Sequence, residues 1–236
     1  MNKLGIIGAM DVEVQTLKEK LQDLQITQKA GMMFYQGTLE NMPVVVVQCG
    51  VGKVNAALCV QILCDLFDVT HLVNTGVAGS LCNDLDIGDF VISKDAMYHD
   101  FTCHILNPAY CVGQVPGMDV LSFPADQMLM DYAMDAAQKV YPDHARIGRV
   151  ASGDQFVADK AQKEQIIADT QAICTEMEGS AIAHSAWRNK VPFVIIRAIS
   201  DKADGSANMD YPTFEAIAAE RCAKVTQELA KRLSIA

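Results

Sequence analysis

Short β-branched runs alternate with longer amphipathic stretches along the whole chain, and this alternation limits the possible folds more than any other feature. The run Val44 to Cys49 is apolar except for Gln48, which is typical of a strand buried on both faces of a sheet. Strands that alternate with helices predict an α/β fold with a mostly parallel central sheet. The expected strands are 4–7, 33–36, 44–49, 71–75, 90–93, 147–152, 172–175 and 193–199, and the expected helices are 12–24, 53–67, 126–140, 161–168, 178–189 and 212–233.

The chain contains no internal repeat, low-complexity run or linker, so we expect one domain over residues 1–236. The only long irregular segment is 100–126, which holds Pro108, Pro116 and Pro124. Loops of this length inside a compact domain are usually functional or form an interface. We therefore expect the loop 100–126 to contribute to function or assembly.

Charge and hydropathy limit the partners that the chain can take. Lys and Arg number 19 and Asp and Glu 29, so the formal net charge is −10. An acidic surface repels phosphate backbones, which argues against a nucleic-acid partner. Apolar stretches such as Val44 to Val47 are too short to cross a bilayer, and the apolar segment after Lys3 is too short for a signal peptide. We expect a cytoplasmic protein that binds a small molecule and neither nucleic acid nor membrane.

The eight cysteines form no Cys-x-x-Cys pair. Cys49, Cys59 and Cys174 lie in apolar runs, where a thiol behaves as a small hydrophobe, and we expect reduced thiols rather than disulfides. One cluster that could be interpreted as metal-binding has a spacing that fits no established zinc pattern. Its members are His99, Cys103, His104 and Cys111.

Small-residue stretches follow two of the expected strands, at 50–53 and 75–79. The first opens a predicted helix, where α/β folds place ligands, although a plain tight turn is an alternative. It is not a dinucleotide fingerprint, because Asn55 stands where the third glycine would be. It is not a P-loop either, because Val47 and Val54 replace the first glycine and the Ser or Thr. Two such turns would leave a shallow floor at the carboxyl edge of the sheet, open to a flat ligand.

Carboxylates lie at or near the ends of three predicted strands: Glu13 after the first, Glu176 and Glu178 after the short strand at 172, and Asp201 after the strand 193–199. Strand ends from distant parts of a chain converge at one edge of such a sheet. Each carboxylate taken singly could be a helix cap or solvated. Arg197 lies inside an apolar strand, where a buried guanidinium needs acidic or hydroxyl partners; Glu178 or a ligand hydroxyl would serve.

Five blocks of sequence occur in a fixed order: Gly8-Ala9-Met10 with Glu13, Gly50-Val51-Gly52-Lys53-Val54-Asn55-Ala56-Ala57, Ser152-Gly153-Asp154-Gln155-Phe156, Glu176-Met177-Glu178 and Arg197-Ala198-Ile199-Ser200-Asp201. Together they resemble the bacterial 5′-methylthioadenosine/S-adenosylhomocysteine nucleosidases of the purine nucleoside phosphorylase superfamily, over nearly the whole chain. The resemblance implies a single nucleoside phosphorylase-like α/β domain with a mixed central sheet flanked by helices. It also implies a homodimer with loop 100–126 at the interface, and a part in methionine salvage. The implied activity is hydrolysis of the bond between adenine and a 5′-substituted ribose, with neither cofactor nor metal.

The same resemblance assigns the central roles. Asp201 would protonate N7 of the purine, and Glu13 would activate the attacking water. Phe156 would stack on the base, the backbone of Val157 would bind its Watson–Crick edge, and Glu178 would bind the ribose hydroxyls. The further substrate-binding residues that it implies are Met10, Val51, Gly79, Tyr110, Pro116, Glu176, Met177, Arg197, Ser200 and Tyr211.

Two other functions stay open, a phosphorylase and a non-catalytic adenosine-binding module. Phosphate needs cationic and hydroxyl donors, whereas the corresponding segments offer Glu13, Asn74 and Val77. Binding alone needs no water-activating base, which argues against the module. The segment 101–112 is longer than the family pattern and has Pro108 about where an aromatic residue is expected. Methylthioadenosine, adenosylhomocysteine, 5′-deoxyadenosine and an aminofutalosine-type nucleoside therefore all remain candidate substrates.

Overall fold

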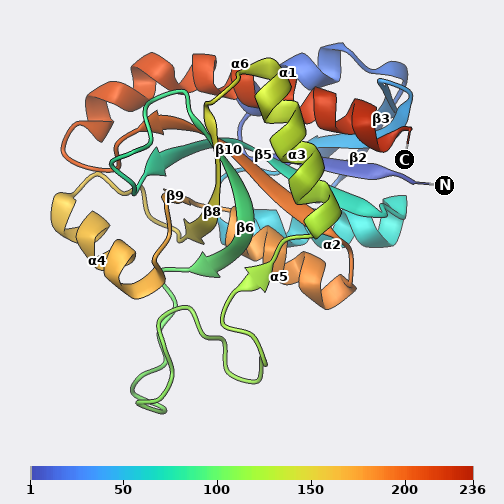
Figure 1. Cartoon of the computed structure of the whole chain (residues 1–236). Coiled ribbons are helices and arrows are strands. Elements are labelled where there is room, and N and C mark those ends of the chain that lie inside the picture. Colours follow the sequence, from blue (N-terminus) through green and yellow to red (C-terminus); the bar gives the residue numbers. More distant parts are fainter. Residues whose placement is uncertain (1, 236) are drawn as a thin grey trace.

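The computed structural model describes residues 2–235, whose strands form one ten-stranded sheet (Figure 1). The path runs β10-β6-β8-β9-β5-β1-β4-β3-β2, with β7 beside β6, and β10 also pairs with β5. Five strands thus close into a ring, and β1, β4, β3 and β2 extend from it. The strands are β1 (Leu4–Gly8), β2 (Gln22–Lys29), β3 (Met32–Leu39), β4 (Met42–Gln48), β5 (His71–Ser80), β6 (Phe90–Tyr98), β7 (Phe123–Pro124), β8 (Ala145–Ser152), β9 (Cys174–Glu176) and β10 (Phe193–Asp201).

Helices cover both faces of this sheet. Leu17 of α1, Ala133 of α3 and Leu229 of α6 belong to one apolar cluster, and Leu63 of α2 and Ile182 of α5 belong to another on the opposite face. Figure 1 shows α1 and α6 on one side of the sheet and α2 and α5 on the other. The helices are α1 (Asp11–Glu19), α2 (Lys53–Phe67), α3 (Gln127–Val140), α4 (Lys160–Thr170), α5 (Gly179–Asn189) and α6 (Ala207–Leu233).

The α/β class with a mixed sheet flanked by helices is confirmed, but the expectation of a mostly parallel sheet is wrong. The pairs β2–β3, β3–β4, β5–β9, β6–β7 and β6–β10 are antiparallel. The first two are hairpins, which need only a short turn between neighbouring strands. Within residues 2–235, no helix combines the length and the apolar content that crossing a bilayer requires.

Several predicted element boundaries are wrong. The helix expected over 12–24 ends at Glu19, and residues 22–29 form the edge strand β2. Its only apolar alternation is the pair Leu24 and Ile26, which is too short to distinguish a strand from the end of a helix. The closing helix begins at Ala207, so Pro212 lies inside it instead of marking its start. The stretch 75–79 is not a turn, since β5 continues to Ser80 through its pairing with β10. The short strand expected over 172–175 is β9, shifted toward Glu176.

Candidate active site

A cavity of about 100 Å³ opens where the carboxyl ends of β1, β5, β9 and β10 meet, the edge at which α/β folds place ligands. The ring closure brings these strand ends together, and the Gly50–Lys53 turn, the segment after β8 and α6 complete the walls. The residues that line it are Ala9, Met10, Glu13, Val51, Val77, Ala78, Gly79, Gln155, Phe156, Val157, Thr175, Glu176, Met177, Glu178, Ser200, Asp201 and Tyr211.

Glu13 is held at the first turn of α1 with its carboxylate pointing back to the end of β1. Its Oε2 accepts hydrogen bonds from the backbone N–H groups of Ala9 (2.7 Å) and Met10 (3.0 Å), and Oε1 accepts one from Val77 N–H (3.0 Å). These bonds fix the carboxylate against two strand ends while it still lines the cavity. Burial raises the pKa of Glu13 above its ordinary value, although Arg197 and the three N–H donors oppose that shift.

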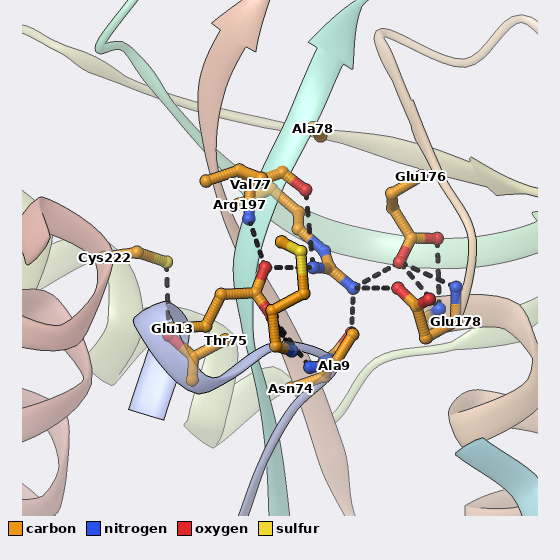
Figure 2. Close-up of polar contacts among 12 residues, drawn as sticks. Ala9, Glu13, Asn74, Thr75, Val77, Ala78, Glu176, Glu178, Arg197 and Cys222 are labelled. Carbon is orange, nitrogen blue, oxygen red and sulfur yellow. Dashed lines mark hydrogen bonds and ion pairs between the residues drawn. The ribbon is translucent and has the colours of Figure 1, made fainter. Parts of the chain in front are cut away.

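Arg197 lies behind the cavity wall and does not line it. Its guanidinium binds the carboxylate of Glu176 and the amide oxygen of Asn74, and its Nη1 donates to the carbonyl of Val77 at 3.4 Å (Figure 2). The nearest oxygen of Glu178 is 3.7 Å from Nη2, so the direct acidic partner is Glu176 and not the expected Glu178. A fully buried guanidinium is stable here because carboxylates surround it.

The close packing around Arg197 depends on a glycine in β5. A Cβ added at Gly76 would lie 2.2 Å from Nη1 of Arg197 and 2.3 Å from Oε1 of Glu13. Any side chain at this position would therefore separate the two charged groups. The glycine in the stretch 75–79 therefore allows β5 to pass close to the buried charges of Arg197 and Glu13.

Glu178 precedes α5 and lines the same cavity. Its Oε1 accepts a hydrogen bond from the backbone N–H of Gly52 at 2.8 Å, which ties β9 to the turn before α2. Burial, together with the charge of Glu176, raises the pKa of Glu178 to about 8, and Arg197 partly opposes this shift. The raised pKa of Glu178 favours its protonated form.

Asp201 ends β10 on another wall of the cavity. Its Oδ1 accepts a bond from Ala203 N–H (2.8 Å) and its Oδ2 accepts one from the Ser200 hydroxyl (2.9 Å). Burial raises the pKa of Asp201 above its ordinary value, which favours a carboxyl group that still carries its proton. Gly79 leaves room for this carboxylate, because an added Cβ would lie 2.8 Å from Oδ1.

An apolar wall faces these carboxylates. Phe156 and Tyr211 meet edge to face with ring centroids 5.4 Å apart, and the Tyr211 hydroxyl lies 3.3 Å from Sδ of Met10. Phe156 remains 49 % exposed, so one ring face is free to stack on a flat ligand. The cavity thus combines an aromatic surface with carboxylates held on separate elements.

The structure brings together in this cavity every predicted site residue except Arg197, Tyr110 and Pro116. Tyr110 and Pro116 lie in the loop 100–126, which projects from the body of the protein (Figure 1). Five lining residues were given no site role from the sequence: Ala9, Val77, Ala78, Gln155 and Thr175. Four of them adjoin predicted site residues, which is the signal that could have found them.

Metal ligation has no geometric support in the part of the chain that the structure describes. No group of three or more His, Cys, Asp or Glu side chains within residues 2–235 is arranged to hold a metal ion, the cluster at 99–111 included. All eight cysteines are free, and Cys49, Cys59, Cys174 and Cys222 are buried.

The mixed sheet and the carboxylate-lined cavity at its carboxyl edge place the protein in the Phosphorylase superfamily, whose family model matches residues 3–231. The chain belongs to the 5′-methylthioadenosine/S-adenosylhomocysteine nucleosidase family of that superfamily. The relative of that name from Halalkalibacterium halodurans is 41 % identical over 234 residues, which cover 99 % of this chain and all of the relative.

Solved structures agree with this assignment. The nucleosidase from Neisseria meningitidis in complex with methylthio-immucillin-A superposes with a TM-score of 0.94 at 32 % identity, covering 98 % of this chain and 100 % of that one. A futalosine hydrolase mutant from Helicobacter pylori superposes with a TM-score of 0.93 at 29 % identity and the same coverage.

Proposed function

We propose that this protein hydrolyses the N-glycosidic bond of 5′-substituted adenosines, releasing adenine and a 5′-substituted ribose. The observation that carries the proposal is the character of the cavity, whose described lining includes Glu13, Glu176, Glu178 and Asp201 but no Lys, Arg or His. A phosphate nucleophile would need cationic donors there, whereas water needs a carboxylate base. The family membership supports the same chemistry.

Asp201 is the proposed general acid. Cleavage of the ribosyl bond leaves its electron pair on the departing purine, and a proton delivered from Asp201 to N7 neutralises that charge. A positioned proton donor contributes roughly 10² to 10⁴ in rate. The raised pKa of Asp201 supports this role, because the carboxyl group must arrive protonated.

Glu13 is the proposed general base on the sugar side. Water adds its oxygen to C1′ and gives a proton to the Glu13 carboxylate, while the C–N electrons leave with adenine. An acid and a base that flank a gap wide enough for water resemble the arrangement of inverting glycosidases. Solvent then returns a proton to Asp201 and removes one from Glu13, which completes the cycle.

The other groups would hold the nucleoside. Glu178 would accept hydrogen bonds from the ribose hydroxyls, Phe156 would stack on adenine, and the backbone of Val157 would bind the Watson–Crick edge. Met10 and Tyr211 would contact the 5′ group from the apolar wall. Arg197 would act through the carboxylates that it holds and not by contact with substrate.

Methylthioadenosine and adenosylhomocysteine are the first substrates to test, since relatives carry both names. A futalosine hydrolase among the structural relatives supports including an aminofutalosine-type nucleoside, with 5′-deoxyadenosine as a further candidate. The experiment scores adenine release from these compounds with and without phosphate. We expect phosphate-independent adenine release; phosphate-dependent formation of a ribose 1-phosphate would establish a phosphorylase, and binding without release a non-catalytic module.

We further propose a cytoplasmic homodimer. Ile105 and Leu106 of the projecting loop and Val54 and Leu58 of α2 are exposed apolar residues that a second copy would cover. Tyr110 and Pro116, which lie outside the cavity of their own chain, would then reach the 5′ end of the neighbouring cavity. Free thiols throughout are typical of a reducing compartment. Sedimentation equilibrium tests the dimer, and a monomer that retains full activity would contradict it.

A further inference from the structure

A compact ion cluster lies beside the cavity without lining it. The Nζ of Lys53 donates to both carboxylate oxygens of Asp100, at 2.7 and 2.6 Å, and lies 3.7 Å from Oδ2 of Asp154. The backbone N–H of Lys53 donates to Oδ1 of Asp154 at 2.8 Å, and the backbone N–H of Asp154 donates to Oδ2 of Asp100 at 2.9 Å. Three segments far apart in sequence are thus fixed to one another by both backbone and side-chain bonds.

Asp154 caps a helix from outside it. Lys53 is the first residue of α2, and none of the residues at that end supplies a side-chain cap. Because Asp154 accepts the free N–H and places a negative charge at the helix N-terminus, it replaces a local cap. Gly52 makes the approach possible, since its φ is +98° and an added Cβ would lie 3.2 Å from Oδ1 of Asp154.

Each end of the cluster leads to a different half of the cavity. The backbone N–H of Gly52, adjacent to Lys53, holds Oε1 of Glu178 on the sugar side. Phe156, on the base side, follows Asp154 by two residues in the same segment. The bond between Lys53 N–H and Asp154 therefore links the turn that holds Glu178 to the segment that carries Phe156.

We propose that Asp154 and Lys53 are positioning residues that set the spacing between the ribose-binding carboxylate and the base-stacking ring. The proposal rests on the proposed function, since it assumes that a nucleoside spans both halves. A rigid ligand that must satisfy two sites at once gains from their fixed separation, whereas a ligand that occupies one site does not. Loosening the link should therefore weaken binding of the whole nucleoside more than binding of free adenine.

The test compares Asp154→Ala with Asp154→Asn in the full-length protein. The alanine variant removes the bond to Lys53 N–H, and the asparagine variant retains an oxygen that can accept it. We expect Asp154→Ala to raise KM for methylthioadenosine about tenfold, the effect of losing one hydrogen bond of ordinary strength. The inhibition constant of adenine should change less than about threefold, and Asp154→Asn should keep both constants within about threefold of the parent.

Asp126→Ala is the matched control. Asp126 caps α3 through Leu129 N–H at 3.0 Å, so its loss removes a comparable cap away from the cavity. It should lower the unfolding midpoint without moving KM. If Asp126→Ala raised KM as much as Asp154→Ala, the effect of Asp154→Ala would be one of general destabilisation, and the proposal would be overturned.

Lys53→Met supplies an independent measurement. Lys53→Met keeps the backbone N–H but removes the ammonium that holds Asp100, which in turn accepts the N–H of Asp154. Because both side chains support the same junction, the effects of Lys53→Met and Asp154→Ala on log KM should be less than additive in the double variant. Equal weakening of adenine and nucleoside binding by Asp154→Ala, or fully additive effects, would overturn the proposal. The parent protein is assayed in parallel. If it releases adenine, a negative result with the variants contradicts only the positioning role of Asp154 and Lys53; if it does not, the proposed function itself fails.

Discussion

The guanidinium of Arg197 binds the carboxylate of Glu176 directly, and both side chains are almost completely buried. The same guanidinium has an oxygen of Glu13 at 3.8 Å and one of Glu178 at 3.7 Å (Figure 2). One cation therefore serves three carboxylates at the edge of the cavity. The buried cluster holds more acidic groups than its single positive charge can balance, and this excess determines how it responds to substitution and to pH.

Replacing Glu176 with glutamine should destabilise the fold. The substitution breaks the direct ion pair and sets an amide NH₂ group against the backbone N–H groups of Glu178 and Gly179 that the carboxylate accepts. Glu13 and Glu178 still face the guanidinium, so we expect a loss of about 1–3 kcal/mol. Urea unfolding of Glu176→Gln measures the loss. Asp95→Asn, which breaks the more exposed pair with Arg149, is the control and should cost less. Equal unfolding midpoints for Glu176→Gln and the parent would contradict this account of the cluster.

Asp201→Asn should abolish most turnover while the fold is kept. The amide oxygen can still accept the bond from Ala203 N–H and the amide nitrogen can donate to Ser200, but no acidic proton remains for N7. We expect kcat for adenine release to fall by about 10² to 10⁴, with an unchanged circular dichroism spectrum. Asp131→Asn, on the surface of α3, is the control. Turnover near that of the parent would rule out Asp201 as the acid.

Glu13→Gln should lose both activity and stability. Both oxygens of Glu13 accept backbone N–H bonds, so either orientation of the amide sets its NH₂ group against an N–H donor. We expect a loss of about 1–3 kcal/mol in the free energy of unfolding. We also expect a fall of about 10² or more in kcat, because the base is gone. Glu19→Gln, exposed on the same helix, should change neither quantity, and full activity of Glu13→Gln would exclude the base assignment.

Stability should fall with rising pH because of Glu178. Its ordinary pKa is 4.5 and burial raises it to about 8 in the folded protein, so the native state retains a proton that the unfolded chain releases. The stabilisation is full below the unfolded value and is lost as pH rises through the folded one. Urea unfolding from about pH 5 to 8.5 should show a shallower decline for Glu178→Gln than for the parent. Parallel curves would show that Glu178 does not titrate in this range.

Strong local patterns predicted most of the fold. The mostly apolar run at 44–49 and the helix 53–67 appear as β4 and α2 nearly as expected. A strand buried on both faces requires a run of apolar residues, and a helix that packs on a sheet requires an amphipathic pattern, so both can be recognised in the sequence. The strand β2 was not predicted because an edge strand is stabilised by hydrogen bonds to its neighbour β3, and the short alternation of Leu24 and Ile26 is a weak indication of that pairing.

The candidate site was also predicted only in part. Resemblance placed Glu13, Glu178 and Asp201 among the site residues, and the structure has all three lining one cavity. It did not indicate that Glu176 is the direct partner of Arg197, because the two residues lie on different strands and meet only in space.

The sequence by itself determined the kinds of elements, their approximate order and the acidic residues available at their ends, since periodicity and residue chemistry act locally. Only the tertiary structure decided that β10 pairs with both β5 and β6, and this closure sets which strand ends share a cavity. It also decided which carboxylate binds Arg197 and that Asp154 caps α2 from a distant segment. Contacts of this kind depend on distances between residues far apart in the chain, which no local pattern encodes.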